Sequence, residues 1–211
     1  MLDSIDIVVW DFDGVINRNY DDKGFLWHRN LEADLGVSFA SLQEDLFGER
    51  WRSVLRGETQ ILDLLTNCLR RVGFRGKAES FLNYWMTRDF LIDPDIVAII
   101  KQLRNLGKEQ AVATNNEPGR TNLLWTEHGL CHLCQHLFSS GRMGVLKPEP
   151  AFFATVEQSL NTQPDRLLLI DDTLENVEAA LERGWQATLY GDFSMWTLGI
   201  PEQLREKVGL T

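Results

Sequence analysis

Apolar residues follow two different patterns along this chain. Short runs that are apolar almost throughout predict buried strands, and they lie at residues 5–10, 109–114, 136–139, 167–170 and 186–190. Between them, apolar positions recur every three or four residues, as in residues 96–106, which is typical of a helix packed against a sheet. Nearly continuous apolar strands that alternate with helices predict an α/β fold, in which a Rossmann-like parallel sheet is sandwiched by helices.

Residues 20–92 break this alternation. They are rich in Leu, Trp, Arg and Glu, contain no convincing strand pattern, and predict helices at 31–35, 41–47, 59–72 and 79–87. Asp93-Pro94 then marks a boundary before the α/β pattern resumes. We therefore expect a small all-helical domain at 20–92, inserted after the first strand of a core formed by 1–19 and 93–211.

Composition and charge limit the classes of function. The 211 residues carry a formal net charge of −10, which disfavours general nucleic-acid binding because phosphate recognition needs basic surface. No segment reaches the roughly 18 apolar residues of a membrane span. The start, Met1-Leu2-Asp3-Ser4, lacks the basic and apolar parts of a signal peptide, so we expect a cytoplasmic protein. Three cysteines do not form a disulfide framework.

Two carboxylates end the first apolar run, in the segment Asp11-Phe12-Asp13-Gly14. On extended backbone, residues two apart point to the same face. Two like charges held together are unfavourable unless a cation or a shared proton compensates them. Taken alone, the segment favours a simpler interpretation, a helix cap followed by a turn aspartate.

Three further polar clusters lie where other predicted elements meet. Thr114-Asn115-Asn116 ends the second strand, Asp171-Asp172 ends the strand at 167–170, and Lys147-Pro148 begins a helix. Since the carboxyl ends of parallel strands share one edge of the sheet, where ligands bind, these side chains are expected to meet Asp11 and Asp13 there.

The motifs and their order resemble the haloacid dehalogenase-like hydrolase superfamily. The chain has its Asp-x-Asp-Gly after the first strand, a Thr after the second, then a Lys and a late acidic pair. The resemblance covers residues 5–18 and 94–192. The placement of residues 20–92 resembles the branch with a helical cap over the active site and, more finely, bacterial sugar phosphatases similar to glucose-1-phosphatase.

The resemblance implies roles for five residues. Asp11 would be the nucleophile that forms an aspartyl-phosphate, and Asp13 the general acid and base. Thr114, through its hydroxyl, and Asn115, through a backbone amide, would hold the phosphoryl oxygens. Lys147 would pair with both Asp11 and the phosphate. The dehalogenases of this superfamily lack the second aspartate, so Asp13 favours phosphoester chemistry.

The resemblance also implies Mg²⁺ as the cofactor. Its ligands would be the carboxylates of Asp11 and Asp172 and the main-chain carbonyl of Asp13, with waters completing six oxygens. Asp171 would orient Lys147 or a metal-bound water. Which member of the late acidic pair touches the metal stays open.

The expected function is therefore Mg²⁺-dependent hydrolysis of a small phosphorylated metabolite, either a sugar phosphate or a phospho-acid. A phosphomutase of the same superfamily remains an alternative, as does a non-catalytic phosphoacceptor or binding protein. The receiver domains of signalling proteins are disfavoured, because their acidic pair comes early and their Lys last. The sequence does not determine the substrate or the oligomeric state.

The cap offers candidates for contact with the leaving group: His28, Arg52, Arg56 and Arg88. Each Arg is more often a solvated side chain or a surface ion pair. Trp27, Trp51 and Trp85 are expected to pack inside the cap rather than to stack on a sugar. The Cys- and His-rich segment 127–136 has a single Cys-x-x-Cys and no second pair, so core packing is favoured over a zinc site there.

Overall fold

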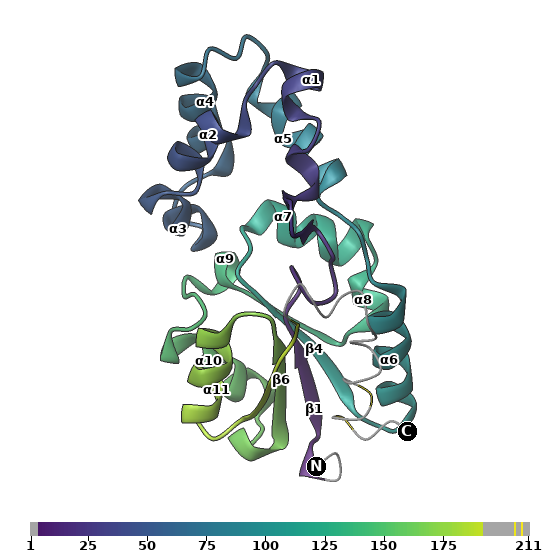
Figure 1. The fold of residues 1–211 in the computed structure, drawn as a ribbon. Coiled ribbons are helices and arrows are strands. Elements are labelled where there is room, and N and C mark those ends of the chain that lie inside the picture. The colour runs from purple at the N-terminus through teal and green to yellow at the C-terminus, as the bar shows by residue number, and fades with distance from the viewer. Residues whose placement is uncertain (1–3, 192–204, 206–207, 209–211) are drawn as a thin grey trace.

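The computed structural model describes residues 4–191, 205 and 208. Its core is a five-stranded parallel sheet with the order β5-β4-β1-β6-β7 (Figure 1). The strands are β1 (Ile7–Trp10), β4 (Glu109–Thr114), β5 (His136–Ser139), β6 (Leu167–Asp171) and β7 (Gln186–Leu189). All five predicted strands are present, and the predicted parallel sheet is confirmed.

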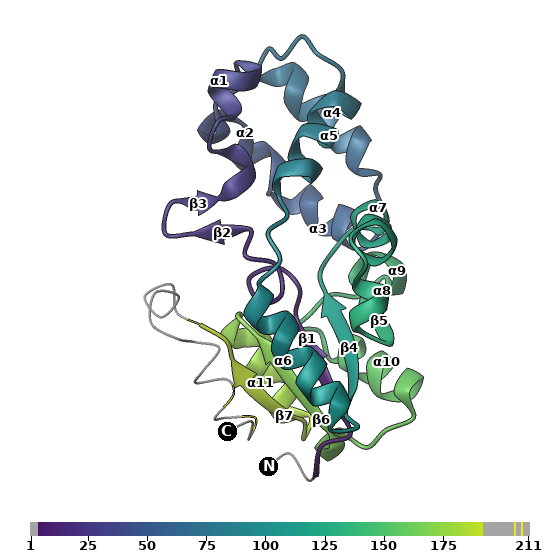
Figure 2. The same cartoon turned by 90° about the vertical axis from the view of Figure 1, so that its right-hand side faces the viewer.

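Alternate residues of the strands face two separate hydrophobic layers. Val8 and Trp10 of β1 pack in the layer that contains α6 (Pro94–Asn105). Ile7 and Val9 pack in the opposite layer, which contains α10 (Pro150–Leu160) and α11 (Leu174–Glu182). Helices lie on both sides of the sheet in Figures 1 and 2, as a sheet that is buried on both faces requires.

Local sequence explains where the core helices begin. Asp93 caps α6 by accepting a hydrogen bond from the backbone N–H of Asp95 at 2.8 Å, and Pro94 occupies the first turn. Glu117 caps α7 (Pro118–Asn122) in the same way. The remaining core elements are short: a π-helical turn at Leu123–Glu127, α8 (Leu130–Leu133), α9 (Ser140–Met143) and a 3-10 turn at Pro164–Arg166.

The segment between β1 and α6 forms a helical cap above the carboxyl ends of the strands (Figure 1). After a 3-10 turn at Leu26–His28, its helices are α1 (Leu31–Leu35), α2 (Phe39–Leu46), α3 (Glu49–Leu55), α4 (Ile61–Arg71) and α5 (Ala78–Arg88). It has its own hydrophobic core around the stacked rings of Trp27 and Trp85.

Two features of the cap differ from the sequence prediction. It begins with a hairpin, β2 (Tyr20–Asp21) and β3 (Gly24–Phe25), and helix α3 was not predicted. Strands of two residues are too short to produce an alternating pattern, and α3 contains a single fully buried apolar residue, Val54. The limits of the cap at residues 20 and 92 stay a prediction.

The two chain segments that join cap and core run side by side. Arg18 donates its backbone N–H to the Leu91 carbonyl at 2.8 Å, and Asp93 donates to the Ile16 carbonyl at 2.9 Å. A second contact lies on the other side of the cap, where Ser140 donates its hydroxyl to the Leu55 carbonyl at 2.7 Å. The cap is thus held to the core at two places.

Among the described residues, no helix is long and apolar enough to cross a membrane.

The buried centre of β6 provides a test of the fold. Leu169 is fully buried, whereas Leu181 on α11 is 51% exposed. Leu169→Ala should lower the free energy of unfolding by about 2–5 kcal/mol, because it leaves a cavity between sheet and helices. The matched change Leu181→Ala should cost less than about 1 kcal/mol. Urea unfolding measures both, and similar losses would contradict the assigned burial.

Candidate active site

Asp11 is the first residue after β1 and lies at the carboxyl edge of the sheet. Its backbone N–H donates to the Ile170 carbonyl of the neighbouring strand at 2.8 Å, and its Oδ1 accepts from the Phe12 N–H at 2.6 Å. The chain then turns at Gly14, whose φ is +86°. A Cβ at Gly14 would overlap the Asp172 carboxylate and the Tyr20 hydroxyl, so the turn can pass between them only without a side chain.

A buried lysine lies between two of the aspartates. Lys147 Nζ is 3.0 Å from Asp11 Oδ1 and 2.6 Å from Asp171 Oδ2. Burial alone would disfavour the charged amine, but the charges of Asp11 and Asp171 outweigh it and raise the pKa of Lys147. Burial raises the pKa of Asp11 well above its usual value, although the Lys147 ammonium opposes that shift. The site therefore has an excess of acidic groups.

The two acids that follow β6 have different surroundings. Asp171 is fully buried and accepts from Lys147, from the Thr173 backbone N–H at 2.9 Å and from Asn176 Nδ2 at 3.0 Å. Asp172 is partly exposed and accepts hydrogen bonds from the Tyr20 hydroxyl and the Thr173 hydroxyl. Burial raises the pKa of Asp172 to about 6, and the nearby charge of Asp13 adds to the shift.

Carboxylate oxygens of Asp11, Asp171 and Asp172 lie within 4.8 Å of one another. Carboxylates so close repel one another unless protons or a cation compensate their charge. Oxygen ligands suit a hard divalent cation such as Mg²⁺, so the residues fit the predicted metal.

The polar residues after β4 have separate tasks. Thr114 accepts from Asn116 Nδ2 at its hydroxyl oxygen, at 2.7 Å, which leaves the hydroxyl hydrogen able to donate. The Asn115 side chain is engaged with the Lys147 backbone by two hydrogen bonds of 2.9 Å. Asn115 thus fixes the loop that carries Lys147, and its side chain is not directed to a phosphate.

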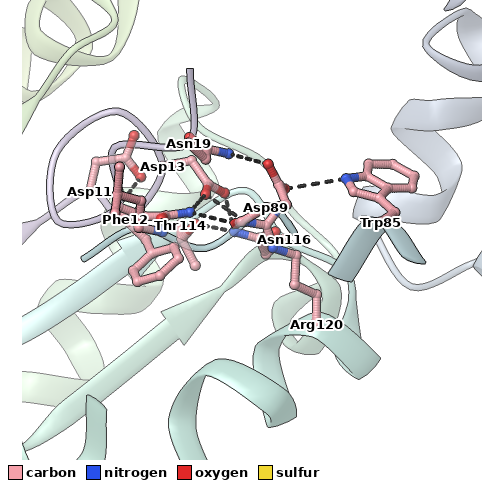
Figure 3. A network of polar contacts seen from close by, with 11 residues as sticks. Asp11, Phe12, Asp13, Asn19, Trp85, Asp89, Thr114, Asn116 and Arg120 are labelled. Carbon is pink, nitrogen blue, oxygen red and sulfur yellow. Dashed lines mark hydrogen bonds and ion pairs between the residues drawn. The ribbon is translucent and has the colours of Figure 1, made fainter. Parts of the chain in front are cut away.

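Among the described residues, three donate hydrogen bonds to Asp13, and two of them, Asn116 and Arg120, are labelled in Figure 3. Oδ1 accepts from Asn17 Nδ2 at 2.8 Å and from Arg120 Nη2 at 2.6 Å. Oδ2 accepts from Asn116 Nδ2 at 2.9 Å. The second aspartate of the motif therefore has partners distinct from those of Asp11.

Arg120 extends this network to the end of the cap. Its Nη1 lies 2.7 Å from Asp89 Oδ2, and Asp89 also accepts from Asn19 Nδ2 at 3.0 Å and from Trp85 Nε1 at 3.3 Å (Figure 3). Burial raises the pKa of Asp89 to about 6, and the Arg120 charge limits the shift. The Arg120 charge is itself buried and is compensated by the two carboxylates.

The structure thus brings the sequence-derived site residues to one edge of the sheet: Asp11, Asp13, Thr114, Asn115, Lys147, Asp171 and Asp172. Sequence reasoning missed Arg120, Asp89, Asn17 and Tyr20, and it assigned no role to Asn116. Tyr20, Asn17 and Asp89 belong to the connections between cap and core, where no strand pattern or motif marks them. Arg120 lies on the short helix α7, for which no pattern was identified in the sequence, and its partners could not be read from spacing.

The cap candidates for the leaving group have other partners. Arg56 pairs with Glu149 of the core and donates to the Gly144 carbonyl at 3.1 Å. Arg52 lies 3.7 Å from the same glutamate. Arg88 lies 3.8 Å from Asp34 and covers the Tyr84 ring within the cap.

The remaining cap candidates are aromatic. His28 stacks on Phe39, with 3.8 Å between the ring centroids. Trp27 and Trp85 are buried in the cap core, and Trp51 packs against it. Within the described residues, the acidic triad is the one group of three or more His, Cys, Asp or Glu side chains whose ligand atoms lie within 4.8 Å of one another, and neither Cys131 nor Cys134 is part of it. Cys134 is buried in the core.

A cavity of about 520 Å³ lies between cap and core, at one side of Arg120. It is lined by α4 and α5 above and by α7 and the π-helical turn below. Its apolar lining includes Ile61, Leu82, Met86 and Leu123. None of the acidic triad lines it, so this space adjoins the Asp13 network rather than the nucleophile.

Residues 5–184 match the family of haloacid dehalogenase-like hydrolases. The chain belongs to this family. The match spans the strand-end motifs and the cap between them, and it confirms the resemblance stated from the sequence.

Two curated relatives span most of both chains, and both are phosphatases. Sesquiterpene phosphatase astK from Aspergillus oryzae is 25% identical over 190 residues, which cover 90% of this chain and 95% of that protein. Phosphatase MT3486 from Mycobacterium tuberculosis is 27% identical over 205 residues, with 88% and 87% covered. The prediction of an enzyme of the haloacid dehalogenase-like hydrolase family is confirmed, and the names of both relatives agree with the predicted phosphatase.

Solved structures show the same fold. A HAD-like family hydrolase from Porphyromonas gingivalis has a TM-score of 0.74 at 20% identity, over 96% of this chain and 98% of that one. The HAD family enzyme bt-2542 from Bacteroides thetaiotaomicron, solved with magnesium and inorganic phosphate, has a TM-score of 0.73 at 17% identity, over 89% and 94%.

The turn at Gly14 gives a test of the site's packing. Gly14→Ala should lower the free energy of unfolding by about 1–2 kcal/mol, because alanine is strained at a positive φ. It should lower it by about 1–3 kcal/mol more, because the methyl group displaces Asp172 and Tyr20. Gly107→Ala is the matched control, since Gly107 has φ +80° with nothing within 4 Å of its Cβ position. Thermal unfolding measures both, and equal losses would contradict the close approach at Gly14.

Proposed function

We propose that this protein is a Mg²⁺-dependent phosphomonoesterase that acts through an aspartyl-phosphate on Asp11. The observation that carries the proposal is the buried Lys147 ammonium, which contacts the Asp11 carboxylate beside two further acids. The Lys147 charge favours the ionised form of Asp11 against the effect of burial on its pKa and attracts a phosphate, and an oxygen-rich cluster suits a hard cation. The two phosphatase relatives support the same reaction.

In the first half-reaction, an Asp11 oxygen attacks phosphorus while the bond to the leaving oxygen breaks. Asp13 donates a proton to that oxygen, so the product leaves as a neutral alcohol. Thr114, the backbone amide of Asn115 and Lys147 hold the remaining phosphoryl oxygens. Their fixed positions stabilise the charge of the transition state without reorganisation.

In the second half-reaction, a water attacks phosphorus and the bond to Asp11 breaks. Asp13 takes the proton of the water, which restores both aspartates and releases inorganic phosphate. Asp171 keeps Lys147 in position, because its other hydrogen bonds are to Thr173 and Asn176. Asp11, Asp172 and the Asp13 main-chain carbonyl would hold Mg²⁺, which neutralises phosphoryl charge when bound.

The substrate belongs to the small phosphorylated metabolites, and the sequence favours sugar phosphates or phospho-acids. The relative astK is named a sesquiterpene phosphatase, and the cavity beside Arg120 has an apolar lining. An apolar phosphate such as a prenyl monophosphate is therefore a third class of substrate to test. Phosphate release across these three classes would rank them. A phosphomutase would instead interconvert phosphate isomers and release little phosphate.

The nucleophile is tested with 4-nitrophenyl phosphate and Mg²⁺. The wild-type protein should release nitrophenol, and Asp11→Asn should lower kcat at least about 1000-fold, because the amide is a poor nucleophile. Asp165→Asn, at an exposed position of the core, is the control and should retain activity. Full activity of the Asp11 variant, or of wild-type protein treated with a chelator, would contradict the proposal.

The metal ligand is tested by Mg²⁺ titration of the enzyme. Asp172→Asn should raise the Mg²⁺ concentration for half-maximal activity about 10-fold or more, since it removes a charged ligand. In wild-type protein that concentration should fall as the pH rises through about 6, because Asp172 must lose its proton to bind a cation. The exposed change Glu178→Gln on α11 is the control. An unchanged requirement in Asp172→Asn would reject this ligand.

A further inference from the structure

Arg120 joins the catalytic motif to the end of the cap through one rigid group. Its guanidinium contacts Asp13 through Nη2 and Asp89 through Nη1, and its side chain is 10% exposed. Asp89 terminates α5, the last helix of the cap. Because the five donors of a guanidinium have fixed directions, the position of one carboxylate restricts that of the other.

The two oxygens of Asp13 are not equivalent. Oδ1 accepts from both Asn17 and Arg120, on the side of the connections to the cap. Oδ2 accepts from Asn116, and the same Asn116 nitrogen also contacts the Thr114 hydroxyl. Oδ2 is therefore the oxygen that shares a donor with the residue expected to bind phosphate, and in the described part of the chain it carries fewer hydrogen bonds than Oδ1, which leaves a lone pair for a proton.

We propose that Arg120 is a positioning residue for Asp13. It anchors Oδ1, so that Oδ2 is the oxygen that exchanges the proton with the leaving group, and Asp89 ties this arrangement to the end of α5. The inference rests on the proposed phosphatase function, since Asp13 is an acid only in that reaction. Arg120 itself does not contact the reacting atoms.

Asp89 is built to hold Arg120. The Asp89 side chain is 3% exposed, and its carboxylate accepts hydrogen bonds from Asn19 and Trp85 in addition to its ion pair with Arg120. Its backbone carbonyl accepts from Asn17 Nδ2 at 3.0 Å, the same nitrogen that contacts Asp13. The first connecting segment thus contacts Asp13 directly through Asn17, and the second, which carries Asp89, contacts it through Arg120. A displacement of the end of α5 would move the partner that fixes Asp13.

Two aryl phosphates of similar shape separate this role from simple stabilisation. Phenol has a pKa of about 10, like the Tyr side chain, and leaves poorly without a proton, whereas the more acidic 4-nitrophenol leaves without help. Arg120→Met should therefore lower kcat/KM for phenyl phosphate at least about 10-fold more than for 4-nitrophenyl phosphate. Arg120→Lys should lower kcat/KM for phenyl phosphate less than Arg120→Met does, because lysine keeps the positive charge but lacks the two-point contact of the guanidinium.

A double variant tests whether Asp89 acts through Arg120. Arg120→Met alone leaves the Asp89 charge buried without its cation, so the variant could unfold. Asp89→Asn/Arg120→Met removes both charges and keeps the protein testable. The double variant should lose no more kcat/KM for phenyl phosphate than Arg120→Met does, because the effects of two residues that act through one contact are not additive. Circular dichroism verifies that each variant is folded.

Arg183→Met is the matched control, since Arg183 also makes a two-point ion pair, with Glu157, on α10. It should alter neither substrate's kcat/KM by more than about 2-fold. Equal losses on both substrates in the folded Arg120 variants would overturn the positioning role. Failure of wild-type protein to hydrolyse either substrate would instead reject the proposed function.

Discussion

The buried contact of Lys147 with Asp11 and Asp171 is the interaction on which the site depends. A lone ammonium or carboxylate would be costly in this interior, and each is tolerated because the others compensate it. The cluster joins three segments that are distant in sequence: the ends of β1 and β6 and the loop before α10. Its geometry is held by neutral groups, chiefly the Asn115 amide on the Lys147 backbone and Asn176 on Asp171.

The parallel sheet supplies the frame for this cluster. Both faces of β1, β4 and β6 are covered by helices, so their carboxyl ends are the exposed edge where polar side chains can gather. The cap lies above that edge and is tied to it at two places. One is the contact of α3 with α9, and the other is the pair of connecting segments that carry Asn17 and Asp89.

Elements with an apolar pattern could be predicted from the sequence, whereas the β2–β3 hairpin and helix α3 could not. The five strands follow from short, largely apolar runs, and helix α6 follows from apolar residues that recur at helical spacing. The β2–β3 hairpin has two residues in each strand, which is below the length at which alternation carries information. The Trp residues of the cap were correctly expected in its core, whereas the partners of Arg56 and Arg88 depend on how helices pack. Asn115 illustrates a finer limit, because the motif predicted a role only for its backbone amide, and nothing in the sequence indicated that its side chain fixes the loop of Lys147.

The sequence by itself determined the family, the sheet and the identities of the acidic and basic groups at its edge. It could do so because these residues stand next to strand ends, where local pattern and chain order fix their place. Only the tertiary structure decided which partners surround each of the two aspartates. Asp11 lies beside Lys147, while Asp13 is held by Arg120, which is 107 residues away and shared with Asp89 of the cap. Such a contact depends on how the end of α5 meets α7 in space, which no local pattern specifies.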